Sequence, residues 1–192
     1  MPASASPANP RSSTTDDRPP EGIDGGADSG AESIASPALS RQTLLYLVAL
    51  VAFLLDRVTK SLVQHKLVLN IPHRFLGGVV YLTRTQNTGA AFSVGVTYGT
   101  FFLLLAAGAS AGIIFYNRRI PTRETWLRVG LGMILGGAIG NALDRAVAGS
   151  VTDFIDLRWW PVFNLADSFI VMGAVVSAVR LSGRDHQSRI RP

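Results

Sequence analysis

The residues best suited to chemistry in this sequence are aspartates inside or beside apolar segments. Asp167 stands near the start of PVFNLADSFIVMGAVVSAV, residues 161–179. A carboxylate at hydrocarbon depth costs at least about 2.5 kcal/mol, which makes it a functional-site candidate by default. Two carboxylates held close in a dry site share one proton, so the pair can activate water and protonate a leaving amine. Asp153 and Asp156 both precede Asp167 closely, and spacing alone does not choose its partner.

Polar side chains at helical spacing accompany these acids. Asp56 and Lys60 are four residues apart and therefore share a helix face. Asn141 and Arg145 have the same spacing, and QNTGAAFS adds Asn87 beside a glycine. The candidate supporting residues are Asp56, Lys60, Asn87, Gly89, Asn141, Asp144, Arg145 and Asn164.

Each companion also has a purely structural interpretation. Asn164 suits a helix N-cap with Asp167 at the third helical position, where the helix dipole favours an acid. Asp56 and Lys60 fit an ordinary ion pair. Asp144 is harder to explain in this way, because an acid at a helix C-terminus opposes the dipole. Their occurrence together in a chain with few charges favours a functional site.

Four apolar segments must position these residues. The chain is 47% hydrophobic and only 16% charged, against about 25% charged in an ordinary soluble domain. Each segment approaches the roughly 20 residues that a membrane-spanning helix needs. Small residues recur four apart, as at Gly108 and Gly112 and at Gly132, Gly136 and Gly140, and predict close helix packing. The expected spans are about Arg41–Leu62, Tyr98–Tyr116, Thr125–Asp144 and Pro161–Leu181.

Alternation of four helices brings the acids to one membrane face. That face receives Asp56, Asp144, Asp153, Asp156 and Asp167. The link NRRIPTRETWLR and the C-terminal end are rich in arginine, which predicts that both lie in the cytoplasm. Both termini are then cytoplasmic, and the acids lie near the extracytoplasmic face.

The segments outside the spans complete the expected organisation. GGVVYLTRTQN alternates with a period of two, which predicts a small extracytoplasmic β element. Two tryptophans beside a proline in DLRWWPVF are typical of the interfacial belt. Residues 1–40 are predicted to be a disordered cytoplasmic tail, 41–182 the catalytic membrane domain, and 183–192 a basic cytoplasmic tail. The fold class is a membrane, all-α four-helix transmembrane bundle with that β element.

Several kinds of chemistry and partner are disfavoured. The chain has no cysteine, which excludes thiol catalysis, and its three histidines show no ligand spacing, so no metal and no cofactor are expected. The net charge of +5 does not indicate nucleic acid, because the basic residues lie between apolar spans without a continuous stripe.

Five motifs in order carry a family resemblance. DRVTK (56–60), NTGAAF (87–92), GGAIGNALDR (136–145), VTDF (151–154) and FNLAD (163–167) together resemble the lipoprotein signal peptidase, or signal peptidase II, family. The resemblance covers about residues 41–182. It implies a bacterial inner-membrane aspartyl endopeptidase that cuts the signal peptide from prolipoproteins before a diacylglyceryl-modified cysteine.

The resemblance also implies roles and partners. The catalytic aspartates fall on Asp153 and Asp167, and the supporting residues on Asp56, Lys60, Asn87, Asn141, Arg145 and Asn164. Membrane lipid and a globomycin-type inhibitor are expected ligands, and a monomer is expected. Two alternatives are a small proton-coupled membrane transporter and an assembly protein that uses Asp–Arg pairs. The transporter would need polar groups on the inner half of the spans, where this sequence has no acids.

Overall fold

The structure is a computed structural model in which residues 41–89 and 98–190 are described. The predicted tail at residues 1–40 and positions 90–92 of the NTGAAF motif lie outside these ranges. The elements, in chain order, are α1 (Arg41–Lys66), β1 (Pro72–Phe75), the 3₁₀ turn η1 (Leu76–Gly78), β2 (Val80–Asn87), α2 (Tyr98–Asn117), α3 (Thr125–Ala148), β3 (Val151–Asp156) and α4 (Leu165–Ile190).

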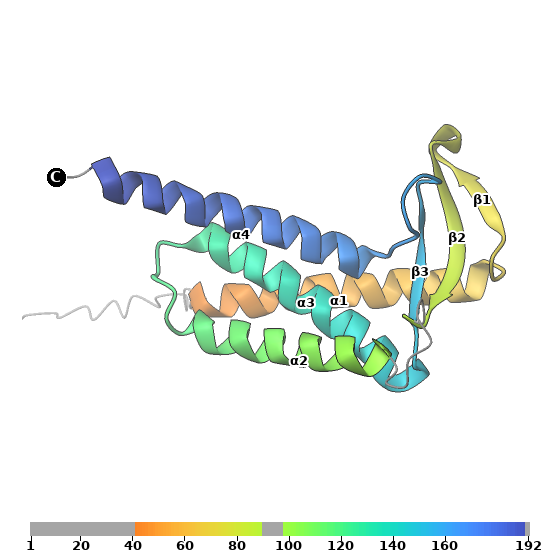
Figure 1. The fold of residues 1–192 in the computed structure, drawn as a ribbon, viewed down its shortest axis with the longest axis horizontal. Helices are drawn as coiled ribbons and strands as arrows, with labels where there is room; N and C mark the ends of the chain where they lie inside the picture. The colour runs from red at the N-terminus through yellow and green to blue at the C-terminus, as the bar shows by residue number, and fades with distance from the viewer. Residues whose placement is uncertain (1–40, 90–97, 191–192) are drawn as a thin grey trace, which may run out of the picture. The chain divides into compact units, whose positions relative to one another are not determined.

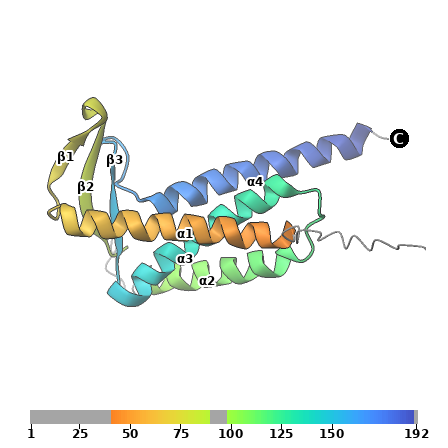
Figure 2. The same cartoon turned by 180° about the vertical axis from the view of Figure 1, so that it is seen from behind.

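The four helices confirm the predicted bundle. Each contains a segment that is long and apolar enough to cross a membrane. Helix α3 packs against α1, α2 and α4 and is therefore the central helix. Figures 1 and 2 show that α1 and α3 end, and α2 and α4 begin, at the end of the bundle that carries the sheet. The alternation expected from the sequence thus brings the distant acids to one end.

Glycines on α3 allow its backbone to approach two neighbouring helices. A Cβ added at Gly132 would lie 2.6 Å from the carbonyl oxygen of Leu45 on α1, and one added at Gly137 would lie 2.5 Å from that of Ala166 on α4. These separations leave no room for a side chain. The predicted close packing therefore holds for α3. It does not hold for Gly108 and Gly112 on α2, where an added Cβ would meet nothing within 4 Å in the described part of the chain.

A three-stranded antiparallel sheet in the order β1-β2-β3 lies at one end of the bundle. In Figure 1 its strands run across the helix ends. The sequence predicts a β element only in GGVVYLTRTQN, residues 77–87, and no strand around Asp153. The structure differs there, because Asp153 lies on β3. The strand is buried almost throughout and so shows none of the polar alternation that would have predicted it.

The fourth helix begins later than the sequence predicts. Its expected start was about Pro161, but α4 starts at Leu165. The preceding residues extend the sheet: the N–H of Phe163 donates to the carbonyl of Ile155 at 3.1 Å, and that of Ile155 donates back at 2.8 Å. This pairing holds the chain extended up to Asn164, which is why the helix cannot start earlier.

Candidate active site

Asn164 and Asp167 form a reciprocal cap at the start of α4. The backbone N–H of Asp167 donates to Asn164 Oδ1 at 2.9 Å, and the N–H of Asn164 donates to Asp167 Oδ2 at 3.2 Å. This is the geometry of a capping box. The capping interpretation of these residues is therefore correct. The same contacts also fix the carboxylate of Asp167 at the positive end of the helix dipole.

Asp153 on β3 accepts a hydrogen bond on each carboxylate oxygen. Asn164 Nδ2 donates to its Oδ1 at 2.7 Å, and Asn87 Nδ2 donates to its Oδ2 at 3.0 Å. Asn87 is held in turn by the backbone N–H of Gly89, which donates to Asn87 Oδ1 at 3.0 Å. Gly89 has φ +69°, a left-handed conformation that glycine adopts without steric cost.

A β-bulge places Asn87 on the same face of the sheet as Asp153. Leu82 pairs with Ile155, but the next ladder pair is Thr85 with Asp153, so β2 holds one extra residue between them. Side chains alternate along a strand, and one inserted residue reverses which face the following ones occupy. Without the bulge, Asn87 would point to the opposite face, away from Asp153.

Asn141 on α3 connects the two aspartates through a second path. Its Nδ2 donates to Asp167 Oδ1 at 2.7 Å. Its Oδ1 accepts from Asn164 Nδ2 at 3.1 Å and from Lys60 Nζ at 2.8 Å. Asp153 and Asp167 are therefore joined by two amide side chains, that of Asn164 just before α4 and that of Asn141 on α3.

A buried ion cluster lies behind Asn141. Lys60, only 1% exposed, lies 2.9 Å from Asp56 and 2.7 Å from Asp144. Arg57 Nη2 contacts Asp144 at 2.6 Å. Asp144 thus contacts two cations from α1, which explains an acid at the C-terminal end of α3. Its partners belong to the cluster and not to the pair formed by Asp153 and Asp167.

Asp156 is bound by other groups than those that link Asp153 to Asp167. Thr83 Oγ1 donates to its Oδ2 at 2.7 Å, and the backbone N–H of Arg158 donates to its Oδ1 at 2.8 Å. Burial alone would raise the pKa of Asp156, but these hydrogen bonds outweigh it and hold the pKa below the ordinary value. Asp156 is suited to fixing the loop after β3 as a permanent anion.

The pKa of Asp153 is shifted in the opposite direction to that of Asp156. Its side chain is 2% exposed, and burial raises its pKa to about 6, although the hydrogen bonds from Asn87 and Asn164 lower it in part. The negative charge of Asp167 adds to the rise. An acid with a pKa near 6 can hold or release a proton near neutral pH, as general acid–base catalysis requires.

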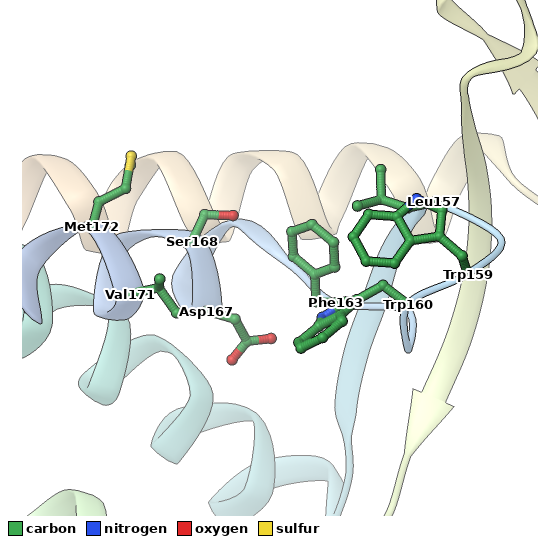
Figure 3. Close-up of a pocket in the computed structure, with 8 residues that line it drawn as sticks. All are labelled: Leu157, Trp159, Trp160, Phe163, Asp167, Ser168, Val171 and Met172. Atoms are coloured by element: carbon green, nitrogen blue, oxygen red, sulfur yellow. The ribbon is translucent and has the colours of Figure 1, made fainter. Parts of the chain in front are cut away.

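Two apolar cavities border Asp167. One, of about 420 Å³, is lined by the loop after β3 and the first turns of α4. Figure 3 shows the Asp167 carboxylate near the rings of Phe163 and Trp160, with Val171 and Met172 further along α4. The other, of about 320 Å³, lies among α2, α3 and α4 and includes Asn141 and Arg145. A substrate that reaches Asp167 therefore meets mainly apolar walls.

Arg145 borders the second cavity and lies over an aromatic ring. Its guanidinium carbon is 5.2 Å from the centroid of Phe102 on α2. Its Nη1 donates to the backbone carbonyl of Asn141 at 3.3 Å. Arg145 and Asp167 line the same cavity, and no ion pair joins them among the described residues.

Some residues at the site were not singled out from the sequence. Arg57 was not among the predicted site residues, although it is next to Asp56 in the DRVTK motif. Phe102 lies in a uniformly apolar helix, so its residue type did not distinguish it from its neighbours. Trp159 and Trp160 were assigned only to the interfacial belt, yet they line a cavity beside Asp167. Among the side chains that the structure describes, which end at residue 183, no group of three or more histidine or acidic side chains is arranged to hold a metal ion.

Comparison with known proteins places this arrangement in a family. The family model described as Signal peptidase (SPase) II matches residues 48–182. The lipoprotein signal peptidase of Mycolicibacterium smegmatis is 42% identical over 175 residues, covering 86% of this chain and 73% of the relative. That of Mycobacterium tuberculosis is 40% identical over 157 residues, covering 78% of this chain and 77% of the relative.

The fold also has a solved counterpart. A structure titled as a bacterial membrane enzyme, determined by the in meso method at 2.3 Å resolution, matches with a TM-score of 0.70. It is 23% identical, and the match covers 78% of this chain and 94% of that one. These similarities support a multi-pass membrane protein and give no support to a transporter. The chain belongs to the signal peptidase II family of aspartic-type endopeptidases.

Proposed function

We propose that this protein removes the signal peptide from diacylglyceryl-modified bacterial prolipoproteins, cutting before the lipidated cysteine, with Asp153 and Asp167 as the catalytic pair. The observation that carries the proposal is the linkage of these two carboxylates by Asn164 and Asn141 at the end of a membrane-spanning helix. The apolar cavities beside Asp167 suit a substrate that is itself anchored in lipid.

The two aspartates have different surroundings, as the proposed roles of a general acid and a general base require. Burial raises the pKa of Asp153 to about 6, so it holds a proton more readily than an exposed aspartate, whereas Asp167 lies at a helix N-terminus and lines a cavity together with Arg145. In the proposed reaction, Asp167 accepts a proton from water as its oxygen attacks the scissile carbonyl carbon. Asp153 protonates the leaving amine of the cysteine. Transfer of the gained proton from Asp167 to Asp153 restores the starting pair.

The proposed location follows from the distribution of arginines. Arg118, Arg119 and Arg123 lie between α2 and α3, at the end of the bundle away from the sheet. By the positive-inside rule this end faces the cytoplasm, so both termini are cytoplasmic and the aspartates lie near the outer face of the bacterial inner membrane. The protein would act as a monomer and would bind a globomycin-type inhibitor at the same site.

Cleavage of a diacylglyceryl-modified prolipoprotein by the purified full-length protein in detergent tests the proposal. The wild type is compared with Asp153→Asn and Asp167→Asn, and an unlipidated precursor serves as the substrate control. Cleavage before the lipidated cysteine that is lost in both variants supports the pair and the substrate class together. Turnover that survives in either folded variant would reject that pair of carboxylates, and Asp156→Asn would be examined next.

A further inference from the structure

Three asparagines direct their amide nitrogens at the two aspartates. Asn87 and Asn164 donate to Asp153, and Asn141 donates to Asp167. An amide can rotate by half a turn and present its oxygen, which would place two acceptors against each other and lose the hydrogen bond. The orientation of each amide is therefore part of the geometry of the site.

Each amide oxygen is held by a group that can only donate. The backbone N–H of Gly89 fixes Asn87, and the backbone N–H of Asp167 fixes Asn164. The oxygen of Asn141 accepts from two side chains, the ammonium of Lys60 at 2.8 Å and Nδ2 of Asn164 at 3.1 Å, and the bond from Lys60 is the shorter and charged one. Lysine has three donors and no acceptor, so it permits only the orientation in which the oxygen of Asn141 faces it.

We propose that Lys60 is a positioning residue for catalysis: it holds the amide of Asn141 in the orientation that directs Nδ2 at Asp167. This inference rests on the proposed function of the Asp153–Asp167 pair. Among the described residues Lys60 makes no hydrogen bond or ion pair with Asp153 or Asp167; its charge acts on Asp153 at longer range, and its effect on Asp167 passes through Asn141. Its ion pairs with Asp56 and Asp144 hold the ammonium within hydrogen-bonding distance of the oxygen of Asn141.

The competing explanation is that Lys60 only neutralises two buried acids. Asp56 and Asp144 both contact it, and a buried carboxylate without its cation would destabilise the fold. Arg57 provides a matched control because it contacts the same two carboxylates, at 3.3 and 2.6 Å, and no amide of the site. A purely neutralising role predicts that loss of either cation has the same kind of effect.

The test combines single variants with a double-mutant cycle. Lys60→Met removes the donor and the charge, whereas Lys60→Gln removes the charge and keeps a donor. Lys60→Met should lower kcat by about 10- to 100-fold with little change in KM, the range found for residues that orient the ligands of metal sites. Lys60→Gln should retain more than about a tenth of the wild-type kcat. Arg57→Met should lower the thermal stability of the protein but change kcat little.

The cycle shows whether Lys60 acts through Asn141. In an Asn141→Ala background, Lys60→Met should cause no further loss of kcat, because no amide remains to be oriented. Losses that multiply in the double variant would overturn the proposal. If Lys60→Met does not fold, Lys60→Gln is the deciding variant. A kcat of Lys60→Gln below about a tenth of the wild-type value would also overturn the proposal.

The same cycle measured by thermal unfolding needs no turnover. Coupling between Lys60→Met and Asn141→Ala in unfolding free energy reports their direct interaction, and additive losses would reject it. A protein that shows this coupling but does not cleave a lipidated precursor would contradict the proposed function alone. A protein that cleaves but shows no coupling would contradict the role of Lys60 alone.

Discussion

The buried carboxylate of Asp56 on α1 accepts the backbone N–H of Ala166, in the first turn of α4, at 3.1 Å. Asp56 is 0% exposed, and the N–H groups of a first helical turn have no partner within their own helix. The contact therefore satisfies a buried donor and places a negative charge at the favourable end of the α4 dipole. It also holds the turn that carries Asp167.

Asp56→Ala should destabilise the protein strongly. The change leaves the N–H of Ala166 unpaired and removes one of the two acids around Lys60, and breaking a buried ion pair costs about 3–5 kcal/mol. We expect the midpoint of thermal unfolding in detergent to fall by about 6 °C or more. Thr59→Ala is the control, because within the described part of the chain Thr59 bonds only to carbonyls of its own helix, and it should change the midpoint little.

Gly140→Ala should disturb the same contact from α3. An added Cβ would lie 2.6 Å from Asp56 Oδ2, which is the oxygen bound to Lys60. Overpacking of this kind costs about 1–3 kcal/mol, so both thermal stability and cleavage should decrease. Gly112→Ala on α2 is the matched change, since a Cβ there meets nothing within 4 Å in the described residues. Equal effects of the two substitutions would contradict the packing described here.

Asn87→Ala should shift the pH dependence of cleavage upward. The hydrogen bond from Asn87 lowers the pKa of Asp153, so its removal raises a pKa that is already about 6. If Asp153 must be protonated to assist the leaving amine, kcat/KM of the wild type falls above about pH 6, and that fall moves to higher pH in the variant.

The measurement for Asn87 is kcat/KM between pH 5 and 8.5, normalised to the maximum of each protein. Ser150→Ala serves as the control, since Ser150, just before β3, donates to Gln86 on β2 and makes no hydrogen bond to Asp153 among the described residues. A falling limb that moves to lower pH in Asn87→Ala would show that Asp153 acts in its ionised form.

Asp153→Asn should remove a pH dependence from the stability of the fold. The pKa of Asp153 rises from about 3.9 in the unfolded chain to about 6, so the folded state binds the proton more tightly. The stabilisation is complete below about pH 4 and is lost as the pH rises through 6. The wild type should therefore weaken by on the order of 1–3 kcal/mol over this interval relative to the variant.

Unfolding midpoints at pH 4 and pH 7.5 test this linkage. The variant can be less stable than the wild type at pH 4, because its new NH₂ group faces a donor of Asn87 or Asn164. The prediction concerns the difference between the two proteins, which should move in favour of the variant as the pH rises. A constant difference would mean that Asp153 is ionised with an ordinary pKa.

Local sequence determined the helices and the cap on α4. An apolar segment near 20 residues long satisfies its backbone hydrogen bonds as a helix, whatever its neighbours are, so the four spans follow from the sequence. Their alternation then brings the acids to one end of the bundle. Asn164 and Asp167 are three residues apart, and the capping box that they form needs only that spacing.

Tertiary structure decided how those acids are paired. Arg57 and Asp144 are 87 residues apart, and Asn141 and Asp167 are 26 apart, so these contacts depend on how α3 packs against α1 and α4. That Asn87 and Asn164 bond to Asp153 and not to Asp156 depends on β3, which the sequence did not reveal, and on a bulge of one residue in β2. A shift of one residue reverses the face of a strand, and local propensity does not determine where such a shift occurs. Only the assembled sheet and bundle show that Asn164 links Asp153 to the helix of Asp167.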